Sequence, residues 1–163
     1  MIKNVLVIAM FAIALGSCNT AKNEKVDGVN AIETKEETKS EAVPYGVAKG
    51  YYVLNTVKNE KVESLRITSQ DHFDRFFGMA TVMGKDGKPT EIDFKKSFVL
   101  ALVGQPSEKD TTFEIAKLVE NGDALELTYV IKQEDEVRTF TTHPCVILVV
   151  DKTYEKDVRF LPL

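Results

Sequence analysis

Two side chains in the segment His143-Pro144-Cys145 are close enough in sequence to act together chemically. Positions i and i+2 of a strand share one face, so the imidazole and the thiol would be neighbours. A neighbouring imidazole can activate a thiol as a nucleophile, and Asp93 or Asp151 could orient the ring in space. However, Cys145 opens the most apolar run of the domain, where cysteine usually packs as a small hydrophobic side chain. We therefore favour a packed Cys145 over a catalytic one.

The second histidine, His72, stands among carboxylates and raises the question of a metal site. On a helix, His72 and Asp74 would point about 200° apart and could not bind one ion together. We expect His72 to lie beside Phe76 on the helix instead. The spacing of His72, His143 and Cys145 does not match a zinc site. We therefore predict no metal and no other cofactor.

The N-terminal segment carries a targeting signal that ends at Cys18. An apolar run, residues 5–15, follows Lys3 and leads into Leu15-Gly16-Ser17-Cys18. The run has the length of a secretory signal and is short for a membrane-spanning helix, although an ordinary signal peptide with a chance cysteine is the alternative. The pattern resembles the lipobox of bacterial lipoproteins. That resemblance implies that residues 1–17 are a signal peptide and that Cys18 is acylated, which attaches the chain to a membrane.

The residue after the cysteine, Asn19, bears on which membrane this is. An aspartate at this position marks inner-membrane retention in enterobacterial lipoproteins, so the resemblance implies the outer membrane here. Whether the protein faces the periplasm or the cell surface stays open.

The composition limits the classes of partner. The 163-residue chain has a formal net charge of −4, and its cations are scattered among carboxylates. Without a basic stripe, nucleic acid and anionic lipid are poor candidates for electrostatic binding. The membrane contact is therefore expected to come from the lipid anchor alone.

Two parts follow the signal peptide. Residues 18–48 are polar, lack an apolar stripe and are predicted to form a disordered tether with a reach of about 30 Å. Residues 49–163 carry the apolar periodicity of one globular domain. This division leaves one β-rich domain attached to the acylated cysteine.

The domain is predicted to be α+β, with about seven strands in a mainly antiparallel, rolled or partly closed sheet and one short helix packed on it. Asn121-Gly122 between two alternating runs predicts a hairpin. Glu134-Asp135-Glu136 indicates a second turn. Ser69 is the expected N-cap of the helix and Gly78 its stop. The expected strands are 51–57, 65–68, 98–103, 113–119, 125–131, 137–142, 145–150 and 158–161, and the expected helix face is Phe73, Phe76, Phe77 and Ala80.

Two segments, residues 92–102 and 141–152, resemble the PrcB C-terminal domain family, whose members are small β-rich domains of exported lipoproteins and of a bacterial protease complex. The similarity covers roughly residues 64–160. The family usually has Gly-Gly-Tyr where this chain has Thr111-Thr112-Phe113. The resemblance implies a non-catalytic domain that engages or accompanies a protease.

These observations favour a non-catalytic module that binds an exported protein, as a protease inhibitor or protease-complex subunit. A structural lipoprotein of the envelope, and an enzyme that uses Cys145 and His143, are the alternatives. The long segment between the helix and the central strand is a predicted contact because long loops in compact domains are often functional, although Met79, Val82 and Met83 could instead pack under the helix as core cover. The turn at 105–110 is the second predicted contact. The predicted partner-binding residues are Met79, Val82, Met83, Lys85, Asp86, Lys88, Gln105 and Glu108.

Overall fold

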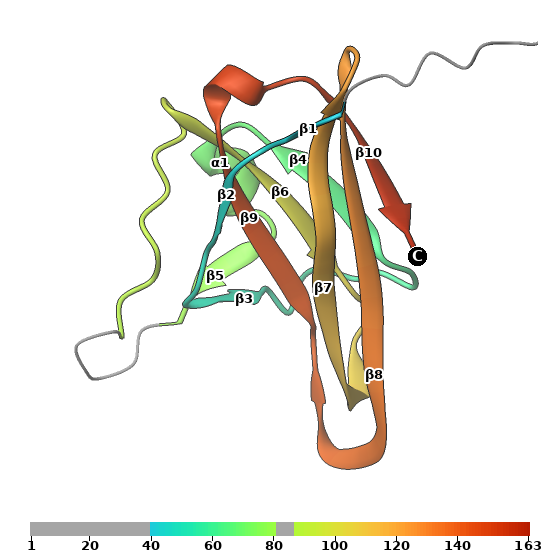
Figure 1. Cartoon of the computed structure of the whole chain (residues 1–163). Coiled ribbons are helices and arrows are strands. Elements are labelled where there is room, and N and C mark those ends of the chain that lie inside the picture. The colour runs from blue at the N-terminus through green and yellow to red at the C-terminus, as the bar shows by residue number, and fades with distance from the viewer. Residues whose placement is uncertain (1–39, 81–86) are drawn as a thin grey trace, which may run out of the picture. The chain divides into compact units, whose positions relative to one another are not determined.

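The computed structural model describes residues 40–80 and 87–163 (Figure 1). It contains two four-stranded sheets and a separate pair of short strands. The predicted fold class, a mainly antiparallel α+β domain with one short helix, is confirmed. The described residues form ten strands rather than about seven, because the chain N-terminal to residue 49 and the residues after the helix also pair.

The first sheet is dominated by one long hairpin (Figure 1). Its order is β1 (Glu41–Ala42), β7 (Ser107–Asn121), β8 (Ala124–Thr142) and β10 (Asp157–Pro162). The hairpin predicted at Asn121-Gly122 is confirmed, and Gly122 has φ +64, a conformation that favours glycine. The last strand, β10, runs parallel to β8.

The second sheet has the order β2 (Tyr45–Val47), β9 (Cys145–Asp151), β6 (Ser97–Val103) and β4 (Glu63–Ile67). All its pairs are antiparallel. The continuous apolar run of β6 was predicted to be a central strand, and six of its seven residues are buried. Such a run indicates a strand that is covered on both faces.

The two faces of β6 serve two apolar cores. Phe98, Leu100 and Leu102 belong to a core shared with β7, β8 and β9. The alternate residues Val99, Ala101 and Val103 belong to a core that includes the helix residue Phe73. This alternation follows from the period-two geometry of a strand.

The helix is shorter than predicted. It spans only α1 (Gln70–Phe73), begins at the predicted N-cap Ser69 and ends at Asp74 rather than Gly78. The next residues leave the helix and form β5 (Phe77–Met79), which pairs with β3 (Tyr51–Val53). The aromatic spacing is satisfied by tertiary packing instead of helix continuation, because Phe73 and Phe77 still meet with ring centroids 4.9 Å apart.

Two further differences concern element boundaries. The turn predicted at 134–136 is part of β8, which absorbs the separate strand expected at 137–142. A 3₁₀ turn, η1 (Lys152–Tyr154), joins β9 to β10. The sheets begin ahead of the boundary expected at 49, since Val43 and Ala48 are buried in the cores.

Among the described residues, the structure has no helix with the length and apolarity to cross a membrane.

Candidate functional site

The thiol of Cys145 is mostly enclosed at the start of β9. Its register partner is Val103 on β6, and it packs against the apolar core that contains Ile147. Burial raises the pKa of Cys145 to about 11. At neutral pH the group is therefore a protonated thiol, whereas the thiolate is the nucleophilic form. This environment suits a packed side chain better than a nucleophile.

The imidazole of His143 is used as a structural hydrogen-bond donor. Its Nε2 lies 2.8 Å from Oδ1 of Asn59, and Nδ2 of Asn59 donates to the carbonyls of Lys61 and Val103. Because the amide nitrogen is already a donor, Oδ1 must accept, so Nε2 of His143 carries the proton. Burial lowers the pKa of His143, and the charge of Lys58 adds to this effect, while the backbone of Gly104 and the charge of Glu63 act in the opposite direction.

Neither aspartate that was considered as an orienting group serves His143. Asp151 Oδ1 accepts hydrogen bonds from the backbone N–H and the hydroxyl of Thr153, at 2.8 and 2.7 Å. These bonds lower the pKa of Asp151. Asp93 Oδ1 accepts from the backbone N–H of Lys95 at 2.9 Å. Both carboxylates stabilise local turns, and the structure does not assemble a Cys-His-Asp arrangement from these residues.

The predicted position of His72 is confirmed. Its ring meets Phe76 edge-on, with centroids 5.6 Å apart. Its backbone N–H donates to Oγ of the N-cap Ser69 at 3.3 Å. In the part of the chain that the structure describes, no three His, Cys, Asp or Glu side chains are grouped as metal ligands.

The predicted contact residues do not form one surface. Met79 ends β5 with 63% of its surface exposed, and it lines a hollow together with Lys88 and Phe73. Gln105 lines a different hollow with Phe113. Glu108 lies within β7 rather than in the turn predicted at 105–110, because that strand begins at Ser107. Val82, Met83, Lys85 and Asp86, together with Cys18, lie outside the described residues.

The feature that sequence reasoning missed is the end of the β7–β8 hairpin opposite its turn. Thr111 pairs with Gln133, Lys109 with Val137 and Ser107 with Thr142. Between one pair and the next, two residues pass on β7, whereas four and then five residues pass on β8. The surplus residues leave the ladder, as in a β-bulge, and such irregularities redirect side chains. We call residues 134–141 the distal segment; Figure 1 shows the chain bending through it before β9.

The distal segment exposes two large apolar side chains. Val137 is 60% exposed and Phe140 is 57% exposed. The guanidinium of Arg138 lies 5.6 Å from the centre of the Phe140 ring, within cation–π range. The same guanidinium forms an ion pair with Asp110 of β7. The ring is therefore exposed to solvent but supported from the hairpin.

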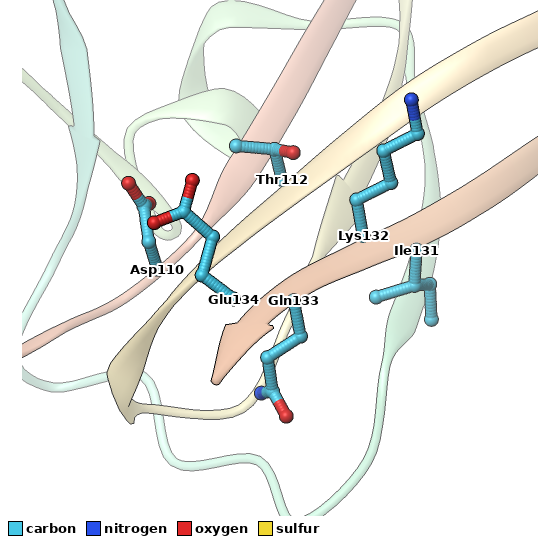
Figure 2. A pocket seen from close by; sticks show the side chains of 6 residues that line it. All are labelled: Asp110, Thr112, Ile131, Lys132, Gln133 and Glu134. Atoms are coloured by element: carbon cyan, nitrogen blue, oxygen red, sulfur yellow. The ribbon is translucent and has the colours of Figure 1, made fainter. Parts of the chain in front are cut away.

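A hollow of about 480 Å³ adjoins this end of the hairpin (Figure 2). Figure 2 shows Lys132 and Glu134 on one side of β8 and Ile131 and Gln133 on the other, as strand alternation requires. Five of the six lining residues are exposed, whereas small-molecule sites bury most of their ligand. The hollow therefore suits polar contact with a larger partner. Its lining residues are Asp110, Thr112, Ile131, Lys132, Gln133 and Glu134.

Polar side chains of β7 and β8 form a hydrogen-bond network at this end, in which Gln133 and Thr142 of β8 bond to β7. Gln133 Nε2 donates to Oγ1 of Thr111 at 3.0 Å, and that hydroxyl donates to the carbonyl of Lys109 at 3.2 Å. The hydroxyl of Ser107 accepts from the backbone N–H of Lys109 at 3.0 Å. The hydroxyl of Thr142 donates to the carbonyl of Ser107 at 3.4 Å. This network replaces part of the regular ladder where β8 bulges.

The sequence carries only a weak signal for this site. The alternation that ends near Ile131 gives way to a polar run, which is typical of a turn. The sequence predicts a separate strand over residues 137–142, which by itself does not say whether Val137 and Phe140 are buried or exposed. Their spacing of three, which breaks the period of two, is the observation that could have indicated exposure.

No family model, curated protein or solved structure matches this chain in the comparisons.

Proposed function

We propose that this chain is a non-catalytic binding module of the cell envelope. It is held at the outer membrane through acylated Cys18 and binds another exported protein, as a protease inhibitor or as a subunit of a protease complex. The observation that carries the proposal is the exposure of Val137 and Phe140 on a supported projecting segment.

The chemistry of the distal segment supports protein binding. Large exposed apolar side chains that are rimmed by polar residues are typical of interaction sites. Aromatic residues and arginine are enriched at the centres of protein interfaces, and here Phe140 and Arg138 are adjacent. Lys132, Glu134 and Gln133 supply a polar margin. An aromatic side chain beside an arginine, with polar residues at the margin, is the arrangement of a protein interface in which one residue contributes most of the binding energy.

The state of the reactive groups supports a non-catalytic role. The thiol of Cys145 has a pKa of about 11, and the proton on Nε2 of His143 is donated to Asn59. A cysteine nucleophile would require a lowered thiol pKa and a base within reach. The enzyme alternative therefore receives no support from this pair.

The choice of a protease as partner rests on the resemblance to the PrcB C-terminal domain family. The two similar segments contribute β6 and β9, which are neighbours in the second sheet. Three residues separate the distal segment from β9, and the second similar segment, residues 141–152, begins at the last residue of the distal segment, Thr141.

The proposal is tested with the affinity-tagged full chain in the cells that produce it. We expect labelled palmitate on the full chain and none on the Cys18→Ala variant. We expect the chain to co-purify an exported protein, and the captured protease to change its activity when the purified domain is added. A full chain without acyl label would contradict the anchor, and co-purification of no exported protein would contradict the binding role.

A further inference from the structure

The distal segment and the strand residues beside it carry an excess of negative charge. Residues 107–112 and 131–141 contain five carboxylates and three cations. The cations are engaged: Lys109 with Asp135, Lys132 with Glu114, and Arg138 with Asp110. The three carboxylates of this region that form no ion pair within the described residues are Glu108, Glu134 and Glu136.

From this charge pattern we infer that the distal segment inserts Phe140 into an apolar pocket of a partner protein whose rim is positively charged. The inference rests on the proposed binding function and specifies the partner's surface. Unpaired carboxylates around an apolar anchor gain Coulomb energy from a basic rim and speed association with it. An acidic rim would be repelled, which excludes many wrong partners.

The support of Phe140 makes it the anchor. Arg138 stacks on the ring and is itself held by Asp110, so the ring loses less conformational freedom on binding than an unsupported side chain. The anchor is therefore placed by the hairpin before a partner arrives.

The charge of the distal segment favours a protein over an anionic membrane. Residues 134–136 are three consecutive carboxylates, which anionic lipid would repel. A basic protein surface attracts the same side chains.

The charge pattern also disfavours a second copy of the chain. A symmetric contact between two distal segments brings identical surfaces together. Residues 134–136 are three consecutive carboxylates, so their approach would place like charges opposite one another. A partner of opposite charge meets no such barrier.

The test uses photo-cross-linking from the full-length chain in the cells that produce it. A photoreactive benzoylphenylalanine replaces Phe140 or Val137 in the test variants and Tyr45 in the control, which is also exposed but lies on β2. We expect the two distal positions to cross-link to one exported protein, at an apolar site flanked by Lys or Arg, and the Tyr45 position to give no such product.

Charge reversal then tests the rim. Glu134→Lys combined with Glu136→Lys should slow association of the purified chain with the cross-linked protein by about tenfold at low salt, with the difference vanishing at 0.5 M salt. Glu41→Lys combined with Glu91→Lys, at two exposed carboxylates outside the distal segment, makes the same change in net charge and is the matched control, which should have little effect. Thermal melting confirms that each variant is folded.

The outcomes separate the inference from the proposed function. Capture of an exported protein only from the Tyr45 position overturns the inference and leaves the binding function standing. Cross-links from the distal positions to lipid or to a second copy overturn the inference as well. Association that is unchanged by charge reversal contradicts the basic rim. Cross-links to no protein from any position, with no exported protein co-purified, overturn both proposals.

Discussion

Asn59 Oδ1 accepts a hydrogen bond from His143 Nε2 at 2.8 Å, across 84 residues of sequence. Asn59 also donates to the carbonyl of Val103, so one amide joins the loop before β4 to the end of β6 and to the residues between β8 and β9. The imidazole is therefore part of the structure that holds the base of the distal segment.

Asn59→Ala should destabilise the domain by about 1–3 kcal/mol, because it leaves a partly buried imidazole and a backbone carbonyl without their partner. Asn55→Ala is the matched control, since Asn55 is exposed, and should change the free energy of unfolding by less than about 0.5 kcal/mol. Urea unfolding measures both. Equal midpoints for Asn59→Ala and the unchanged protein would show that the bridge contributes nothing.

The lowered pKa of His143 predicts a pH dependence of stability. The unfolded imidazole titrates at about its ordinary pKa of 6.5, whereas burial first, and the charge of Lys58, depress the folded value. As the pH falls below about 6.5, the unfolded chain therefore binds more protons at His143 than the folded chain does. The free energy of unfolding decreases until the pH passes below the pKa of the folded state. Above that window the contribution is fully present.

The measurement is the free energy of unfolding of the unchanged protein and of His143→Gln between pH 7.5 and pH 5. The difference between the two should shrink towards the acidic end, because the variant lacks the titrating group. A difference that stays constant, or that grows as the pH falls, would contradict the depressed pKa.

The raised pKa of Cys145, about 11, predicts a slow reaction with iodoacetamide at pH 8. Only about one thiol in a thousand is then ionised, against roughly a quarter for a free thiol of pKa 8.5. Labelling of the Cys145 peptide, followed by mass spectrometry, should be at least about 100-fold slower in the folded protein than in urea. Labelling at similar rates would reopen the enzyme alternative.

Gly122 of the hairpin turn is constrained by its backbone rather than by neighbours. Its φ is +64 and no atom lies within 4 Å of an added Cβ. Gly122→Ala should cost about 1 kcal/mol of stability from backbone strain alone. Gly46→Ala is the control, because that site is equally open and lacks a positive φ. Thermal unfolding of the pair distinguishes strain from crowding, and equal melting temperatures would contradict the strain.

Much of the fold was predictable because local signals and tertiary packing agree. Asn121-Gly122, the continuous run of β6 and the N-cap Ser69 are each recognised from the residues themselves. The length of α1 was not predictable from the sequence, because Phe77 fits the spacing of a helix face and also fits a strand. Only the pairing with β3 decides that Phe77 belongs to a strand.

The distal segment was not predictable for a related reason. The segment is exposed because β8 has more residues than β7 between successive paired positions. This mismatch is a property of the pair of strands, so the sequence of one strand alone does not reveal it. The predicted contact Met79 belongs to the long segment after the helix, and Gln105 to the turn predicted at 105–110. The structure places them beside different hollows, neither of which includes the distal segment.

The most direct test of the central claim is the dissociation constant of the captured exported protein for the Phe140→Ala variant. Because Phe140 is the anchor, the constant should rise at least about tenfold, with an unchanged melting temperature. Tyr45→Ala, the control at an exposed aromatic on β2, should leave it within about twofold. An unchanged constant for Phe140→Ala, or an equal loss for Tyr45→Ala, would contradict the account.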